Sequence, residues 1–502
     1  MAKLKAPRNG VRVRMYRQGH GDCFLLTMRG QDGDAFHVLI DCGFKPGSEI
    51  TAKVEDVIKD IVEATGGRID ILIVTHEHQD HVNLFTAKLD DQPLFDAIDV
   101  GQLWLGWTAN PKDELADKVR KGHDEAVGML RKARKRLGAQ LDKAGLSAGI
   151  DEMLALEGFG AAGKTGISKA TTERSVAAAM RYLTAKVPDE KKRKYFLPHE
   201  AVDVAGVPGL RVISLGPPRS RSELNKDEPK AAGERDRVYD KGHGLSFGFS
   251  FGLGGLLPAT ETDSDEDAGE DYMPFAAGHS LRGKTKDSNA RFFEFLYGKD
   301  DGHPLGWRRI ERDWLFALDW FARKINVEVN NSSLVLALEL TASRKVLLFA
   351  GDAQYGNWLS WDDRPIRLDD GSSTTVQELL GRTVLYKVGH HGSHNATLKG
   401  TVDSAYANLD WLGRDGVAKD EFVAMIPANE PWALAVKPDP WVHPLPAIRA
   451  ALDEKAKGRV FQSNIDFAAM KREGGSQDAW DEFVRRSKGS SDLYFDYWVP
   501  DE

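Results

Sequence analysis

Ile71-Leu72-Ile73-Val74-Thr75-His76-Glu77-His78-Gln79-Asp80-His81 is the most informative stretch of this sequence. Residues 71–74 form a continuous apolar run, which predicts a buried strand. Among the polar residues that follow, His76 and His78 are two positions apart, so they lie on the same side of extended backbone. Zinc and related ions bind neutral histidine nitrogen and carboxylate oxygen. Because the adjacent Asp80 and His81 point in different directions, the stretch predicts two neighbouring metal sites.

Two later apolar runs also end in polar residues. Residues 346–350 lead into Asp352, and residues 384–388 lead into His390 and His391. A carboxylate at the end of a buried strand is unfavourable unless a positive group meets it. We expect Asp352 to bridge the two metals. One of the two histidines, with a slight preference for His391, is expected to bind the second metal, and the other to lie beside it or on the substrate.

The order His-x-His-x-Asp-His after a strand resembles the defining motif of the metallo-β-lactamase superfamily. The resemblance implies an α/β fold, the metallo-β-lactamase αββα sandwich, with a metal site at the strand ends. We expect two divalent ions, zinc or manganese, with these ligands: His76, His78, Asp80, His81, Asp352, His390 and His391. The superfamily contains lactamases, thioesterases, lactonases, phosphodiesterases and nucleases, so the substrate has to be inferred from other features.

A narrower resemblance links the chain to ComEC-type competence proteins. The similar segments are residues 19–23, 39–43, 330–336, 348–353, 387–393 and 442–446. The soluble domain of that group is regarded as a DNA nuclease, so the resemblance implies cleavage of a phosphodiester. The chain departs from the group at His20, where the group has glutamine. It also has no isolated histidine near Gly216, where the superfamily usually has one, and the remaining candidates lie in predicted insertions or loops: His199, His243, His279 and His303.

Further side chains are expected to act around the predicted metals. The candidate catalytic residues are Asp80, Lys387 and His443. We expect Lys387 and His443 to contact a phosphate or to protonate the leaving oxygen. Asp22 and Asp41 are expected to orient metal ligands without binding the metals themselves. For His443 a turn at the start of a helix is an equal alternative, because a residue that precedes proline favours extended backbone.

The composition predicts a soluble globular protein of the cytoplasm. The chain has 502 residues, of which 41% are hydrophobic and 29% are charged. It contains no run of about 18 apolar residues, so no membrane span is expected, and its basic N-terminus lacks the apolar stretch of a signal peptide. Cys23 and Cys42 are the two cysteines, and both lie in apolar strand contexts, which predicts buried reduced thiols.

The order of patterns along the chain predicts one sandwich assembled from two halves. Residues 112–200 have helical spacing, residues 259–271 form an acidic loop, and residues 158–165 match a phosphate-binding loop without the strand that such a loop requires. The predicted parts are a first half (1–108), a helical insertion (109–205), a core strand (206–218), a charged insertion (219–324), a second half (325–465) and a C-terminal extension (466–502).

The net charge of −8 argues mildly against a general nucleic-acid-binding protein, but two basic clusters occur at residues 131–136 and 191–194. The candidates for contact with nucleic acid are Arg131, Lys132, Arg134, Lys135 and Arg136. An exposed helix face without a partner is the equal alternative. The candidates for base stacking, which core packing explains equally well, are Trp104, Trp107, Trp314 and Trp320.

Together these features predict a metal-dependent phosphodiesterase or nuclease that acts on DNA or RNA. The first alternative is a metal-dependent hydrolase of a small molecule, such as a lactone, a thioester or a cyclic nucleotide. A narrow pocket roofed by the helical insertion would favour that alternative, and a broad basic groove would favour the nuclease. The second alternative is an interaction scaffold stabilised by metal, although ligands at each recognised metal position argue against it.

Overall fold

The computed structural model describes residues 3–50, 53–89, 92–144, 150–151, 154, 176–229, 232–240, 291–292, 311–436 and 440–502. The chain forms two compact units, Met1–Lys241 with Leu318–Glu502 and Gly242–Ala317, and the sandwich lies in the first of them. The predicted acidic loop, the phosphate-loop match and the side chain of Arg136 lie outside the described residues. Among the described helices, none is both long and apolar enough to cross a bilayer.

Within the described residues the first sheet has seven strands and combines antiparallel with parallel pairing. In spatial order they are β18 (Tyr494–Val499), β1 (Val11–Tyr16), β2 (Cys23–Arg29), β3 (Ala35–Cys42), β4 (Arg68–Ile73), β7 (Asp99–Gly106) and β8 (Arg193–Phe196). The pairs from β18 to β3 are antiparallel, and those from β3 to β8 are parallel. The parallel part matters for function, because β3 and β4 end at the same edge.

The second sheet repeats this plan with seven described strands. In spatial order they are β17 (Val460–Gln462), β16 (Val423–Ile426), β15 (Thr383–Lys387), β12 (Val346–Phe349), β11 (Val335–Leu340), β10 (Leu210–Gly216) and β9 (Ala201–Asp203). β12, β15, β16 and β17 run parallel to one another, so β12 and β15 also end at one edge. Two short ribbons complete the strands: β5 (Lys88–Leu89) with β6 (Gln92–Pro93), and β13 (Ile366–Arg367) with β14 (Ser373–Thr374).

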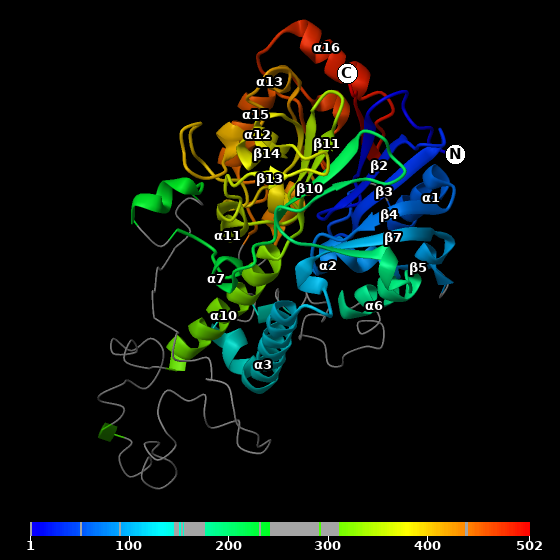
Figure 1. The fold of residues 1–502 in the computed structure, drawn as a ribbon. Helices are drawn as coiled ribbons and strands as arrows, with labels where there is room; N and C mark the ends of the chain where they lie inside the picture. Colours follow the sequence, from blue (N-terminus) through cyan, green and yellow to red (C-terminus); the bar gives the residue numbers. More distant parts are fainter. Residues whose placement is uncertain are drawn as a thin grey trace. The chain divides into compact units, whose positions relative to one another are not determined.

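Helices cover the outer faces of both sheets (Figure 1). The described helices up to residue 224 are α1 (Val54–Thr65), α2 (Gln79–Val82), α3 (Glu114–Ala144), α6 (Val176–Lys186) and α7 (Arg221–Leu224). Those that follow are α10 (Glu311–Asn331), α11 (Tyr355–Leu359), α12 (Val376–Gly381), α13 (Ala418–Glu421), α14 (Glu430–Ala435), α15 (Pro446–Ala456) and α16 (Gln477–Arg486). In Figure 1, α1 and α6 lie beside the blue sheet, and α12 and α15 lie beside the yellow one.

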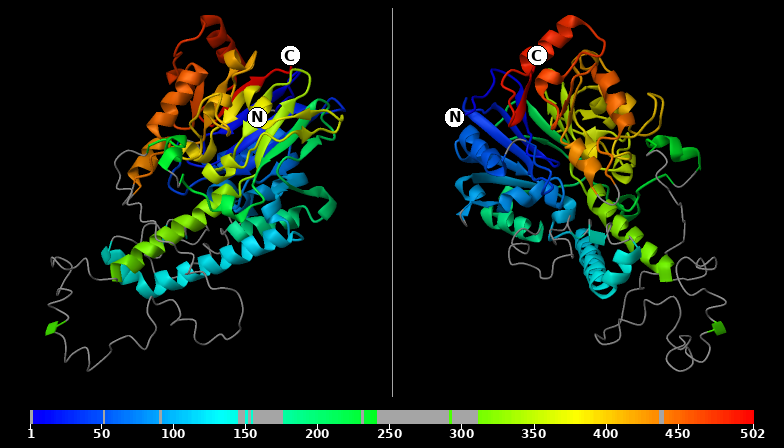
Figure 2. Two further views of the ribbon diagram at one scale, coloured as in Figure 1. Left: turned by 60° about the vertical axis from the view of Figure 1, so that its left-hand side comes forward. Right: turned by 180° about the vertical axis from the view of Figure 1, so that it is seen from behind.

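The alternation of side chains along the strands explains the layers. Ile71 and Ile73 of β4 pack into the core between the sheets, whereas Leu72 packs against the helices outside. In β12, Leu347 and Val346 divide in the same way. Successive side chains of a strand point to opposite faces, so a strand covered on both faces has a continuous apolar sequence. The predicted αββα sandwich is confirmed, and Figure 2 shows its N-terminal and C-terminal halves from two further directions.

Three strands lie in segments for which the sequence predicted other roles. β8 and β9 fall inside the predicted helical insertion, and β18, in the predicted C-terminal extension, pairs with β1. Each is the last strand at an edge of its sheet. Edge strands tolerate charged residues, and Arg193 and Lys194 of β8 remove the apolar run that identifies an inner strand. The predicted core strand is present as β10.

The two cysteines are buried and free, as predicted. Cys23 and Cys42 are paired positions of β2 and β3, and their Sγ atoms are 3.5 Å apart. Each one directly follows an aspartate of the candidate site, Asp22 or Asp41, and packs in the core on the side of α1.

Candidate metal centre

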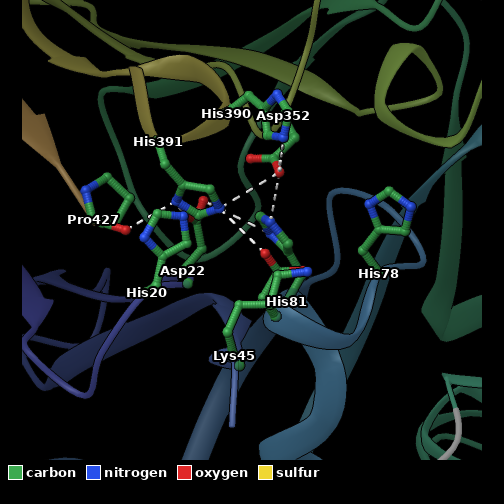
Figure 3. Close-up of polar contacts among 12 residues, drawn as sticks. His20, Asp22, Lys45, His78, His81, Asp352, His390, His391 and Pro427 are labelled. Atoms are coloured by element: carbon green, nitrogen blue, oxygen red, sulfur yellow. Dashed lines mark hydrogen bonds and ion pairs between the residues drawn. The ribbon is translucent and has the colours of Figure 1, made fainter. Parts of the chain in front are cut away.

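The predicted metal ligands meet where three strands end. β4 leads into His76 and His78, and α2 then carries Asp80 and His81. Asp352 follows β12, and the histidine pair after β15 lies in a tight turn, Gly389–Gly392. Figure 3 shows His81 on the blue N-terminal ribbons and Asp352 and His391 on the yellow C-terminal ribbons converging on one place. The site is therefore assembled from both sheets of the sandwich.

The first cluster contains His76, His78 and Asp352. One potential ligand atom of each lies within 4.8 Å of the others, and all three side chains are buried. His76 Nε2 is 3.0 Å from His78 Nδ1 and 3.8 Å from Asp352 Oδ2. Two histidines and a carboxylate are a donor set that suits zinc or a related divalent ion.

The second cluster contains Asp22, His81, Asp352 and His391, again buried and with ligand atoms within 4.8 Å of one another. His81 Nε2 is 3.2 Å from Asp352 Oδ2, and His391 Nε2 is 3.7 Å from the same oxygen. Asp352 thus belongs to both clusters, which is the position predicted for a bridging carboxylate. Asp22 is close enough to serve as a ligand itself, a role that the sequence did not predict for it.

The second nitrogen of each ring in the second cluster is held from behind. His81 Nδ1 is 2.8 Å from Asp41 Oδ2, and His391 Nδ1 is 2.9 Å from the carbonyl oxygen of Pro427. Asp41 also accepts hydrogen bonds from the backbone N–H and the hydroxyl of Thr75, at 2.8 and 2.6 Å. Such partners keep the proton on Nδ1 and leave Nε2 as the ligand atom. This geometry fits the orienting role predicted for Asp41.

Backbone strain is concentrated at the same place. Asp41, His390 and His391 have φ angles of 54°, 41° and 54°, in the left-handed region. A residue with a side chain in this region is disfavoured by about 1–3 kcal/mol and persists only where its surroundings hold it. In the turn after β15, these angles direct the two adjacent histidines to different positions.

The unpaired atoms of the centre fit a divalent cation. Among the described residues, the buried polar atoms without a hydrogen-bond partner include Nε2 of His78, Nε2 of His81, Oδ1 of Asp22 and Oδ1 of Asp352. Buried polar atoms are almost always hydrogen-bonded. These atoms are all of ligand type, and buried atoms of this kind are satisfied best by a positive ion.

The charges of the centre support the same conclusion. Burial lowers the pKa of His76 well below its usual value and that of His78 to about 3, so both rings are neutral, as ligands must be. Burial also acts to lower the pKa of His81, but Asp352 and Asp22 outweigh it and raise that pKa well above its usual value. The field around His81 Nε2 therefore favours a positive charge at the point where the second cluster would hold one.

Residues 16–84 match the metallo-beta-lactamase superfamily. The matched segment includes Asp22, Asp41 and the histidine motif. A crystal structure of a beta-lactamase domain protein from Burkholderia ambifaria aligns with 16% identity and a TM-score of 0.19, over 41% of this chain and 44% of that chain. The chain thus spans less than half of that protein's length. The search of curated proteins found no match. The superfamily match and the histidine–aspartate clusters indicate a metal-dependent hydrolase.

Two predicted ligands lie at the margin of the clusters. Asp80 Oδ2 is 3.2 Å from His391 Nε2, while Asp80 Oδ1 is 3.3 Å from the ammonium group of Lys45. His390 Nε2 is 4.0 Å from Asp352, and its Nδ1 is 2.8 Å from the side-chain amide of Gln354. Of the two neighbouring histidines, His391 therefore lies deeper in the centre.

Lys387 occupies a different position from the one predicted for it. Its ammonium group forms an ion pair with Asp22, lies 3.5 Å from Asp352 Oδ1 and donates to the carbonyl oxygen of Gly351 at 2.7 Å. Burial acts to lower its pKa, but Asp22 and Asp352 raise it above the usual value. A buried lysine held in this way neither reaches a phosphate nor releases its proton readily, so Lys387 is better described as a counter-charge that positions the carboxylates.

His443 and His20 lie beside the centre. The His443 ring is half-buried, stacks on His20 at 5.6 Å and lies 5.4 Å from His390. His443 therefore remains the candidate for contact with substrate. His20, the departure from the ComEC-type pattern, is fully buried, and its ring lies 4.2 Å from that of His391. The sequence did not predict this position for His20, because comparison with the ComEC-type motif marked it only as a substitution.

Of the histidines considered for a further ligand, His199 is described, and it lies near Arg364, outside both clusters. The other three, His243, His279 and His303, lie outside the described residues. The first cluster therefore has three protein ligands within the described part of the chain.

The basic cluster on α3 is only partly exposed. Lys132 and Lys135 are exposed, but Arg134 is buried and donates to both carboxylate oxygens of Asp151, at 2.7 and 2.9 Å. Arg134 therefore does not belong to a basic surface, because its charge is used inside the helical insertion. Arg131 is exposed as well.

The tryptophans considered for base stacking are core residues where they are described. Trp104 is 3% exposed and packs between the sheets, and Trp107 is fully buried against α3 and α7. Core packing is thus the correct interpretation for both. The side chains of Trp314 and Trp320 lie outside the described residues.

Proposed function

We propose that the chain is a metal-dependent phosphodiesterase that cleaves nucleic acid with two divalent ions, zinc or manganese. The observation that carries the proposal is the pair of buried clusters that share Asp352. Enzymes that catalyse displacement at phosphorus often hold two ions about 3.5–4 Å apart. The sequence resemblance to ComEC-type proteins, whose soluble domain is regarded as a nuclease, favours a nucleic acid over other substrates.

The residues of the centre would either bind the ions or position the residues that do. His76, His78 and Asp352 would hold one ion, and Asp22, His81, Asp352 and His391 the other. Bound ions would supply Lewis acidity and bring the pKa of a water close to neutrality. Asp41 and Pro427 would keep the ligand rings in place, and Lys387 would balance the excess of carboxylate charge.

His443 is the residue placed to contact the substrate. It is partly buried, and its Nδ1 has no hydrogen-bond partner among the described residues. We infer that its ring donates a hydrogen bond to a phosphate oxygen or to the leaving oxygen. Lys132 and Lys135 on α3 supply exposed positive charge, which supports a long anionic substrate but does not require one.

The test is hydrolysis by the purified protein loaded with Mn²⁺ or Zn²⁺. The substrates are plasmid, single-stranded DNA, RNA and bis-p-nitrophenyl phosphate, with a lactone and a thioester as competing classes. His76→Ala should abolish cleavage and lower the bound metal. His37→Ala is the matched control, because His37 is a buried histidine of β3 that belongs to neither cluster. Turnover of the lactone or thioester alone would replace the phosphodiesterase by the small-molecule alternative.

A further inference from the structure

Two partly exposed tryptophans lie next to the metal centre. Trp432 belongs to α14, and Trp441 precedes His443 in the segment that leads to α15. Their ring centroids are 5.3 Å apart at an interplanar angle of 83°, so the edge of one ring meets the face of the other. This packing fixes the orientation of both rings while leaving part of each accessible.

A chain of rings connects the pair to the candidate ligands. Trp441 is 5.9 Å from His443, which is 5.4 Å from His390. His20 lies 5.3 Å from Trp432 and 4.2 Å from His391. The tryptophans are therefore one ring away from the residues that surround the predicted metals, and a group bound on them would be a direct neighbour of the reacting phosphate.

Charged and polar contacts hold the pair in this position. The ammonium group of Lys45 lies 5.5 Å from the Trp441 ring centroid and 3.3 Å from Asp80 Oδ1, so one side chain links the tryptophan to the histidine motif. Asn429 caps α14 by accepting from the N–H of Trp432 and donates to the carbonyl oxygen of Ser48 at 2.8 Å. The platform is thus anchored on both halves of the sandwich before any ligand arrives.

Exposed apolar residues adjoin the pair in the sequence. Leu434 and Val442, close to the tryptophans in sequence, are 45% and 37% exposed. Trp358, Trp361 and Trp411, by contrast, are at most 3% exposed and belong to the core of the second sheet. Core packing therefore explains those three tryptophans, whereas Trp432 and Trp441 are each partly exposed.

We propose that Trp441, braced by Trp432, is a stacking platform for a nucleobase next to the scissile phosphodiester. This inference rests on the proposed function and specifies its substrate. A base presents a flat π-face of any sequence to an indole ring, and such stacking contributes strongly to the binding of single strands. The nearby His443 supplies a polar contact for the sugar-phosphate chain beside the base.

The experiment compares the wild type and its tryptophan variants on two substrates. One substrate is a single-stranded oligonucleotide, and the other has the same length and phosphates but an abasic tetrahydrofuran at each position. Trp441→Ala should raise KM for the first substrate roughly 5- to 150-fold, the range expected for one base stacked on an aromatic ring. The same change should leave KM for the abasic substrate nearly unaltered. Trp441→Phe keeps an aromatic ring, so its KM for the first substrate should stay close to that of the wild type.

Trp480→Ala is the matched control. Trp480 is a partly buried tryptophan of α16, a helix that carries none of the site residues, so its removal should affect both substrates equally. If Trp441→Ala unfolds the protein, Trp432→Ala is measured in the same comparison. An equal loss on both substrates would overturn the stacking platform and leave the phosphodiesterase intact. A wild-type protein that cleaves neither substrate would remove the proposed function, and the platform with it.

Discussion

Replacing Asp41 by asparagine tests whether the second cluster is a metal site. The Asp41 carboxylate accepts three hydrogen bonds, two from Thr75 and one from His81 Nδ1. The asparagine amide has nearly the same shape, but one of its two ends donates. That end would face His81 Nδ1, so the ring would move its proton to Nε2. Nε2 is the atom that faces Asp352, and a protonated nitrogen cannot bind a metal.

The size of the effect follows from these contacts. Loss of a partner that orients a metal ligand lowers metal affinity about 10- to 100-fold. The hydrogen bonds to the buried carboxylate are charge-assisted, and losing the charge should destabilise the fold by about 1.5–3 kcal/mol. We therefore expect Asp41→Asn to remain folded at room temperature, to unfold at lower urea, and to release Zn²⁺ to a weaker chelator.

Asp60→Asn is the control for the loss of a buried carboxylate. Asp60 is 4% exposed and accepts hydrogen bonds from Arg14 and the Tyr16 hydroxyl, at 2.6 and 2.7 Å, outside both clusters. Both variants should lose stability in urea, but only Asp41→Asn should lose metal affinity in a chelator titration. If Asp41→Asn holds Zn²⁺ as tightly as the wild type, His81 is not a metal ligand and the second cluster has to be abandoned.

Three further changes probe other parts of the structure. Lys387→Met should destabilise the metal-free protein by about 3–5 kcal/mol in urea unfolding, because two buried carboxylates lose their counter-charge. Added Zn²⁺ should reduce this loss of stability. An equal loss with and without Zn²⁺ would contradict the role of Lys387 as a counter-charge. Burial lowers the pKa of His37 to about 4. The neutral ring therefore contributes fully to the free energy of unfolding above an unfolded-state pKa of about 6.5, and this contribution is lost as the pH falls toward 4. Between about pH 7.5 and pH 5, the free energy of unfolding of the wild type should fall by about 2 kcal/mol more than that of His37→Asn. The double change Lys132→Glu and Lys135→Glu should weaken binding of long DNA and lower the slope of log affinity against log salt concentration by about 2 units. Turnover of a small phosphodiester should not change. An unchanged slope would show that this surface is only a solvated helix face.

The parts of the fold and site that are local in sequence could be predicted from the sequence. The histidine motif, Asp352 and the turn with His391 each follow an apolar run, and a strand end is visible in one short window. The positions of Asp22, Lys45 and Lys387 could not be predicted, because their partners come from distant segments and their pairing depends on how the two sheets meet.

The sequence alone also does not show which charged side chains are buried and which are exposed. Arg134 and Lys135 are adjacent in a basic run, yet one is buried against Asp151 and the other is exposed. The difference arises from the helical period and from a partner 17 residues away. Trp107 and Trp441 show the same limit for aromatic residues, because composition does not distinguish a core ring from a partly exposed one.

The pairing of β18 with β1 also affects how the protein is made. Val11 at one end of the chain pairs with Val499 at the other. Ribosomes add about 5–20 residues per second, so about 500 residues take about 25–100 s. During that time one edge of β1 presents unpaired N–H and C=O groups, which attract strands of other chains. Nascent chains that have not reached residues 494–499 would therefore need a chaperone or a low local concentration to avoid aggregation through this edge.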